Sequence, residues 1–159
     1  MRSLHALLSP ALFVGALCGQ SLTQITTANW AHQDAKINAA GTHIGYRTGH
    51  ANLGVATFNS SSDVQIYTSA SNTVNSFVWD PNGLSLYFSE GAAVKAISRG
   101  GLGLSTLAAS VAGTSVALWA CDGTYIYGAR QDSATGFAYV FRLRTNGGTA
   151  ADIATLTGT

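Results

Sequence analysis

Charged side chains are scarce in this chain of 159 residues: only 9% are Asp, Glu, Lys or Arg, against roughly 25% in an average soluble domain. Eight Lys and Arg offset seven Asp and Glu, so the formal net charge is +1. The chain therefore lacks the basic field that attracts nucleic acid and the acidic field that attracts cations, and we expect no nucleic-acid partner. Hydrophobic residues make up 47%, so the chain must bury much of its surface and is not disordered.

Proline and cysteine are also rare, with two residues of each. Glycine occurs 18 times, which is typical of many short strands joined by tight turns, so the sequence predicts an all-β fold. Cys18 lies in the N-terminal segment described next, which leaves Cys121 without an intramolecular disulfide partner once that segment is removed. No Cys-His signature surrounds Cys121, and we interpret it as a small buried residue in a turn or at a strand end.

Residues 1–19 have the organisation of a secretory signal peptide. Arg2 precedes an apolar run over 7–17, and small residues lie near the end of that run. The run is too short for a membrane-spanning helix, which needs about 20 apolar residues. We expect cleavage after Ala16 or Cys18, no membrane span in the mature chain, and a secreted, periplasmic or cell-envelope location. A lipid-modified Cys18 and a buried N-terminal helix remain as alternatives.

A repeat of about 40 residues runs through the rest of the chain. A glycine followed three residues later by a branched aliphatic residue occurs at intervals of 42 and 40 residues, at Gly41, Gly83 and Gly123. Trp79 and Trp119 lie four residues before the second and third glycines, and Ile37 occupies that position in the first copy. Such periods are typical of β-propeller blades or of helical HEAT and armadillo repeats.

The local pattern favours strands over helices, because apolar segments of about four to six residues alternate with Gly, Asn, Asp and Ser clusters. The first copy has segments at 36–38, 43–47, 54–58 and 64–68. The second has them at 76–79, 84–89, 94–97 and 104–108, and the third at 115–119, 124–129, 139–143 and 152–156. Four strands per repeat predict a propeller blade. We therefore expect one partial β-propeller domain at 20–159, with three four-stranded antiparallel blades at about 30–70, 74–110 and 114–158.

The turns between the first two strands of each blade carry specific residue types. Asn82-Gly83 and Asp122-Gly123 are hairpin signals, because these residue types tolerate the positive φ of tight turns. For Asp80 and Asp122 we expect side-chain hydrogen bonds to the backbone of the turn itself.

The second copy resembles the repeat of TolB-like six-bladed propellers, which are WD-like repeats of bacterial envelope proteins. The resemblance lies in Phe77-Val-Trp-Asp-Pro-Asn-Gly83 followed by Leu86-Tyr-Phe-Ser89. Residues 39–46 and 121–127 are looser copies, and the first lacks the tryptophan and the proline. The resemblance covers about 35–159 and implies the blade fold. It implies no single activity, since the family includes translocation-complex members, oligopeptidase-associated propellers and secreted proteins.

Three blades are fewer than the four to eight with which a propeller ring usually closes. We expect either further blades beyond Thr159 or, if the chain is complete, self-association through the apolar faces left open. Residues 21–26 could form the outer strand with which this family often closes its final blade, although that final blade is absent from the three predicted here.

The search for chemical motifs assigns no catalytic, cofactor-binding or metal-binding residue. His32, His43 and His50 lie near Asp34, but their spacing matches no metal site. No serine stands in a G-x-S-x-G elbow, and the glycines at 100–103 lack the lysine of a phosphate loop and fit a hairpin turn. The recurring aromatic residues are expected in the core between blades and not on a carbohydrate platform: Trp79, Trp119, Tyr46, Phe88 and Tyr127.

Two functions remain open from the sequence. The first is an exported β-propeller that binds a protein, peptide or other ligand in the cell envelope or extracellular space. The alternative is the N-terminal half of a propeller-containing hydrolase or lactonase, with catalytic residues beyond the C-terminus. The gene sequence after Thr159 would distinguish them, because a G-x-S-x-G segment would favour the enzyme and further blade repeats the binding module.

Overall fold

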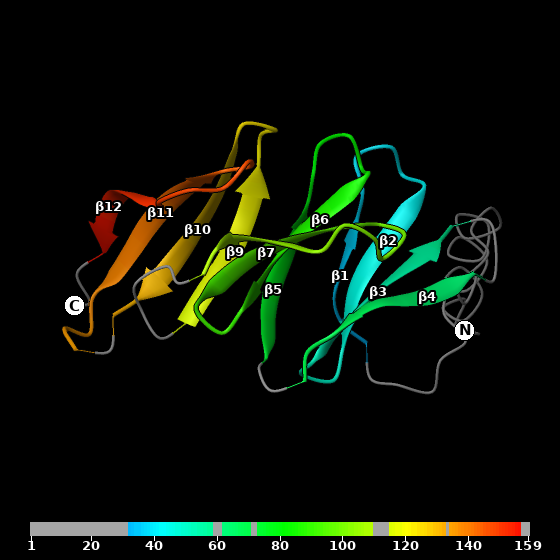
Figure 1. Cartoon of the computed structure of the whole chain (residues 1–159), viewed down its shortest axis with the longest axis horizontal. Helices are drawn as coiled ribbons and strands as arrows, with labels where there is room; N and C mark the ends of the chain where they lie inside the picture. Colours follow the sequence, from blue (N-terminus) through cyan, green and yellow to red (C-terminus); the bar gives the residue numbers. More distant parts are fainter. Residues whose placement is uncertain (1–31, 59–61, 71–72, 110–114, 133, 157–159) are drawn as a thin grey trace, which may run out of the picture.

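The computed structural model describes residues 32–58, 62–70, 73–109, 115–132 and 134–156. These residues form twelve strands in three four-stranded antiparallel sheets, and each sheet is a meander in chain order (Figure 1). The predicted signal peptide at 1–19 and the predicted outer strand at 21–26 lie outside the described residues. Within the described part of the chain, no helix has the length and apolar character needed to cross a membrane.

Blade one consists of β1 (His32–Ile37), β2 (His43–Thr48), β3 (Asn52–Thr57) and β4 (Asp63–Thr68). Blade two consists of β5 (Val74–Trp79), β6 (Ser85–Glu90), β7 (Ala93–Ser98) and β8 (Ser105–Ala108). Blade three consists of β9 (Ser115–Cys121), β10 (Tyr125–Gln131), β11 (Ala138–Arg144) and β12 (Ala151–Leu156). Each strand overlaps a segment predicted from the sequence, so the all-β fold with three four-stranded blades is confirmed.

The three blades stand in a row, with blade two between the other two (Figure 1). Their first strands are neighbours, since β1 contacts β5 and β5 contacts β9. The last strands, β4, β8 and β12, lie at the ends of their sheets. This is the arrangement of consecutive blades around part of a propeller ring.

The hydrophobic core is divided into two seams, one on each side of blade two. The first seam packs blade one against blade two and contains Leu53, Val55, Ile66, Val74, Phe77, Trp79, Leu86, Phe88 and Ile97. The second seam packs blade two against blade three and contains Val78, Val94, Val116, Leu118, Ile126, Phe141 and Leu143. Blade two therefore supplies apolar side chains to both seams, as alternation along a strand buried on both faces allows.

Gly45 in β2 allows blade two to pack closely against the backbone of blade one. A Cβ at this position would lie 2.8 Å from a ring carbon of Phe77 and 3.0 Å from a methyl carbon of Leu86. Such distances are shorter than van der Waals contact, so any side chain here would push blade two away. The missing side chain lets the aromatic face of blade two lie directly on the backbone of blade one.

An Asn or Asp begins the first turn of every blade, at positions 38, 80 and 122, which are 42 residues apart each time. Oδ1 of Asp80 accepts a hydrogen bond from the amide of Asn82 at 2.7 Å, and Oδ1 of Asp122 accepts one from Thr124 at 2.7 Å. The predicted side-chain hydrogen bonds at Asp80 and Asp122 are confirmed. Asn38 does the same in blade one, with the amide of Thr42 at 2.9 Å, and this Asx position is the most regular repeat signal in the chain.

The prediction that Trp79 and Trp119 are equivalent and both buried is wrong for Trp119. Trp79 is 9% exposed, whereas Trp119 is 53% exposed. Trp79 pairs with Leu86, and the corresponding residue of blade three, Ile126, pairs with Cys121. Cys121 is therefore the structural counterpart of Trp79, because the turn in blade three is two residues shorter.

A β-bulge in β9 accounts for the exposure of Trp119. Tyr127 pairs with Ala120 and the next residue, Gly128, pairs with Leu118, so Trp119 has no partner in the ladder. A bulged residue leaves the regular inward and outward alternation. Counting backwards from Gly123 could not reveal this extra residue.

Candidate functional site

Polar groups cross the first seam and attach blade two to blade one. The indole Nε1 of Trp79 donates to the carbonyl oxygen of Lys36 at 2.8 Å, and Nζ of Lys36 donates to the carbonyl oxygen of Phe77 at 2.6 Å. Burial lowers the pKa of Lys36, although the nearby Asp34 partly opposes this effect. These groups are used within the fold, so we do not assign them to a ligand.

Glu90 forms a second polar cluster at the same seam, beside a cavity of about 400 Å³. It is 7% exposed and forms an ion pair with Lys95, while Oη of Tyr67 donates to its other oxygen at 2.7 Å. Burial alone would raise the pKa of Glu90, but hydrogen bonds from Lys95, Ser69 and Tyr67 outweigh it and lower the pKa. Both carboxylate oxygens are bonded, so this cluster joins blade one to blade two.

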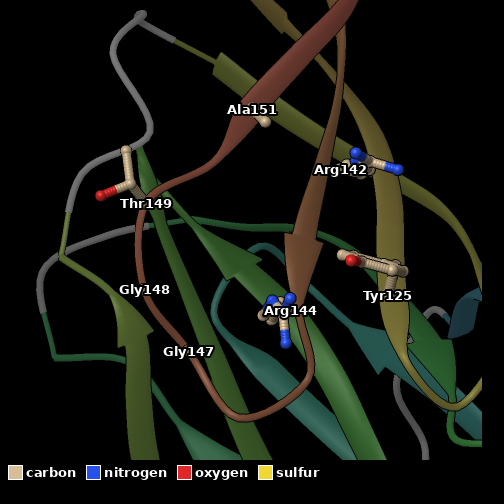
Figure 2. Close-up of a pocket in the computed structure, with 7 residues that line it drawn as sticks. All are labelled: Tyr125, Arg142, Arg144, Gly147, Gly148, Thr149 and Ala151. Carbon is tan, nitrogen blue, oxygen red and sulfur yellow. The ribbon is translucent and has the colours of Figure 1, made fainter.

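The second cavity, of about 310 Å³, lies on blade three and is lined by β10, β11, the β11–β12 loop and β12 (Figure 2). We call it the arginine pocket. Its lining residues are Tyr125, Arg142, Arg144, Gly147, Gly148, Thr149 and Ala151. Its volume is at the lower end of the range found for small-ligand sites.

Strand alternation places the two arginines of this pocket. Phe141 and Leu143 are fully buried in the second seam. Because successive side chains point to opposite faces of a sheet, Arg142 and Arg144 lie on the face of β11 turned away from blade two. We call this the open face of blade three.

Both arginines lie close to one aromatic ring. The Cζ atom of Arg142 is 4.9 Å from the ring centroid of Tyr125, and that of Arg144 is 5.7 Å from it. The ring of Tyr127 lies 6.4 Å from that of Tyr125 and extends the aromatic surface. Cation–π contacts of this kind hold guanidinium groups in place while leaving their N–H donors available.

Tyr127 is linked to the turn that precedes β10. Its Oη donates to Oδ2 of Asp122 at 2.8 Å. Three groups lower the pKa of Asp122: the amide of Tyr125, the hydroxyl of Tyr127 and the amide of Thr124. Asp122 is thus bonded to its own turn and to Tyr127, and within the described residues it forms no ion pair with either arginine.

The arginine pocket carries uncompensated positive charge. The ion pairs found in the described part of the chain use Arg47, Lys95 and Arg130, and the last of these is paired with Asp152. Within the same residues, neither Arg142 nor Arg144 has a carboxylate partner. Two exposed guanidinium groups with free donors suit a carboxylate or a phosphate, which arginine can bind in a bidentate manner.

The residue type at one equivalent position of the third strand differs among the three blades. Val55 pairs with Gly45, Ala96 with Tyr87, and Arg142 with Tyr127. Val55 is buried in the first seam, so blade one uses this position for apolar packing on the next blade. On blade three the equivalent residue is Arg142, which is charged and exposed, and arginine is a residue type enriched in protein–protein interfaces.

The residues considered from the sequence do not gather into this site. Asp34 pairs with Arg47, His43 contacts Oγ1 of Thr42 through Nδ1 at 2.8 Å, and His50 lies in the turn after β2. Among the described residues, no three His, Cys, Asp or Glu side chains are close enough to hold a metal ion.

Cys121 lies at the end of β9, as predicted, and is half-buried; burial raises the pKa of its thiol. The glycines at 100–103 form the turn between β7 and β8, as predicted, with the amide of Gly101 donating to Ser98. Of the aromatic residues expected in the core, Trp79, Tyr46 and Phe88 are buried. Trp119 is exposed and Tyr127 lies half-buried on the open face, so the prediction is wrong for these two.

The sequence analysis missed the arginine pocket. A net charge of +1 for the whole chain concealed two neighbouring arginines that form no ion pair within the described residues. The signal that could have revealed it is the alternation Phe141-Arg-Leu-Arg144, since a strand with this pattern is apolar on one face and basic on the other.

No protein family model matches the chain, and no curated protein sequence matches it. Solved structures do. A chain of a crystal structure of a nidogen/laminin complex matches with a TM-score of 0.64 and 8% identity, over 79% of this chain and 49% of that chain. The structure of a putative TolB from Agrobacterium tumefaciens matches with a TM-score of 0.62 and 15% identity, over 82% of this chain and 49% of that chain.

These similarities confirm the β-propeller fold expected from the resemblance to TolB-like repeats. The chain spans about half the length of the solved structures it matches.

Proposed function

We propose that this protein is an exported β-propeller module that binds a protein or peptide partner through the open face of blade three. The observation that carries the proposal is the arginine pocket, with Tyr125, Arg142 and Arg144 exposed or half-exposed around one cavity. Tyr and Arg are enriched in protein interfaces and at their energetic hot spots. The exposed Trp119 and Ile153 add apolar surface to the same blade.

The comparisons support the binding role at the level of fold. One of the matched structures is a complex between nidogen and laminin, so a protein of this fold is found bound to another protein. The polar clusters at the first seam are fully used within the fold, whereas the arginine pocket has two guanidinium groups that form no ion pair among the described residues. For these reasons we place the partner on blade three.

The export part of the proposal rests on Arg2 and the apolar run at 7–17. We expect the protein in the periplasmic or extracellular fraction of its native host, with a mature N-terminus between Leu17 and Ser21. Terminal sequencing of the fractionated protein is the measurement. An intact Met1 on the exported form would contradict the signal-peptide assignment.

Site-specific photo-crosslinking tests the binding face. A photoreactive phenylalanine analogue at Thr149, on the rim of the pocket, should give a discrete adduct with one partner in the native host. The matched control is the same analogue at Leu84, which is 54% exposed in a turn of blade two. Identical adducts from both positions, or none from Thr149, would show that this face is not the binding surface.

A further inference from the structure

We infer that the arginine pocket binds an extended acidic peptide segment whose carboxylates lie at alternate positions, one against Arg142 and one against Arg144. This inference rests on the proposed function, because it names the chemistry of the partner at the same face. It depends on the charge of the patch, the spacing of its arginines and its size.

The two guanidinium groups of the arginine pocket form a small patch of positive charge. Both lie within 6 Å of the Tyr125 ring centroid, at 4.9 and 5.7 Å, and neither has an acidic partner among the described residues. Two like charges on the same face repel each other, and a carboxylate near each removes this cost. Bidentate pairing with carboxylates is the geometry for which the guanidinium fork is suited.

The strand sets the spacing of the two arginines. Arg142 and Arg144 are alternate residues of β11 and therefore lie on one face, roughly 6.6 Å apart along the strand. An extended peptide has the same rise per residue, so its alternate side chains have the same spacing. A segment with acidic residues at positions i and i+2 therefore matches both arginines at once, whereas adjacent acidic residues point to opposite sides.

The size of the patch argues against nucleic acid as the occupant. Nucleic-acid binding usually neutralises several phosphates along a basic groove. Here only two unpaired arginines gather, in a chain with a net charge of +1.

The test uses two fluorescent peptides of identical composition, Ser-Glu-Ser-Glu-Ser and Ser-Glu-Glu-Ser-Ser, with the purified protein. Fluorescence anisotropy should show that the alternating peptide binds more tightly than its isomer. Replacing both arginines in an Arg142→Gln/Arg144→Gln variant should weaken binding by about tenfold or more, the scale of one charged hydrogen bond. Arg99→Gln, which removes an exposed arginine from a turn of blade two, is the matched control and should change nothing.

Four results would overturn the inference. They are equal binding of the two peptides, unchanged binding in the double variant, displacement by inorganic phosphate at the peptide's own concentration, and tighter binding of an oligothymidylate. If the double variant does not fold, NMR decides: the Arg142 and Arg144 Nε–H signals of the unaltered protein must shift on titration with the alternating peptide. If Thr149 crosslinks a partner but the alternating peptide does not bind, the open face of blade three remains the proposed interface. Only the inference of an acidic peptide segment is then refuted.

Discussion

Single side chains decide how closely the blades of this molecule approach one another. Gly45 clears space for the ring of Phe77, and Trp79 fills the first seam while its indole N–H bonds to the carbonyl of Lys36. Trp119 has none of these roles, because the bulge in β9 removes it from the ladder. Trp79 and Trp119, although they have similar neighbours in the sequence, therefore contribute differently to the stability of the fold.

Replacing each tryptophan by alanine measures this difference. Trp79→Ala should lower the free energy of unfolding by about 3–5 kcal/mol, because it leaves a cavity in the first seam and an unpaired carbonyl at Lys36. Trp119→Ala should change it by less than about 1 kcal/mol, since that side chain is half in solvent. Urea denaturation of both variants gives the two values, and equal losses would contradict the different burial of the two side chains.

Glu90 makes the stability depend on pH in a defined direction. Its pKa is lowered in the folded protein, so the folded state favours the carboxylate and its contribution is complete above the unfolded-state pKa of about 4.5. The contribution is lost as the pH falls through the lower, folded-state pKa.

Glu90→Gln should therefore cost about 2 kcal/mol near pH 7, the scale of a hydrogen bond to a charged group. The cost should shrink as the pH is lowered towards the folded-state pKa. Denaturation curves over that pH range are the measurement, with Asp80→Asn as the control, since Asn38 shows that an amide oxygen makes the same turn hydrogen bond. A cost that does not change with pH would mean that the Glu90 charge has no part in the seam.

Strands and turns were the most predictable elements, for local reasons. All twelve strands follow from short apolar segments and the residues between them, and the Asx turns follow from Asp80 and Asp122 alone. The bulge at Trp119 was not predictable, since it depends on pairing with Tyr127 and Gly128 in another strand. The arginine pocket was missed because it depends on the distance of Arg142 from acidic residues elsewhere in the fold, which composition does not contain.

The second seam depends on two serines. Ser89 is fully buried, and its Oγ donates to the carbonyl oxygen of Val116 at 2.8 Å while lying 2.9 Å from Oγ of Ser76. Ser76 in turn accepts a hydrogen bond from the amide of Leu118 at 2.6 Å. Side chains of blade two thus bond directly to the backbone of β9 in blade three.

Ser89→Ala should loosen the attachment of blade three. Removing the hydroxyl takes away the side-chain hydrogen bond to the Val116 carbonyl and one of the hydrogen bonds of Ser76, at a cost of roughly 1–3 kcal/mol. Ser105→Ala, on exposed β8, should cost less than about 0.5 kcal/mol and serves as the control. Thermal denaturation of both variants measures the difference, and indistinguishable melting temperatures would show that the serines do not hold the seam.

Across the whole molecule, blade two is the most enclosed part. It contributes to both seams, whereas all six residues of β12 are exposed. Local opening is expected where few buried contacts hold a strand. Stability should therefore decrease from blade two towards β12.

Amide hydrogen exchange followed by NMR tests this gradient. The amides of β5 and β6 that bond within their sheet should exchange only through global unfolding. Those of β12 that bond to β11 should exchange faster by at least about tenfold, through local fraying. Equal protection in β12 and β6 would show that the three blades open as one cooperative unit.

The meander order of the strands has a consequence during protein synthesis. Each blade completes its backbone pairing within one continuous stretch of chain, so blade one can form its sheet as it leaves the ribosome. Its buried Leu53 and Val55, however, pack on Phe77 and Phe88, which are translated later. At roughly 5–20 residues per second, that apolar face stays uncovered for on the order of seconds. During that interval the apolar face of a nascent blade one is exposed to association with other chains, until blade two covers it.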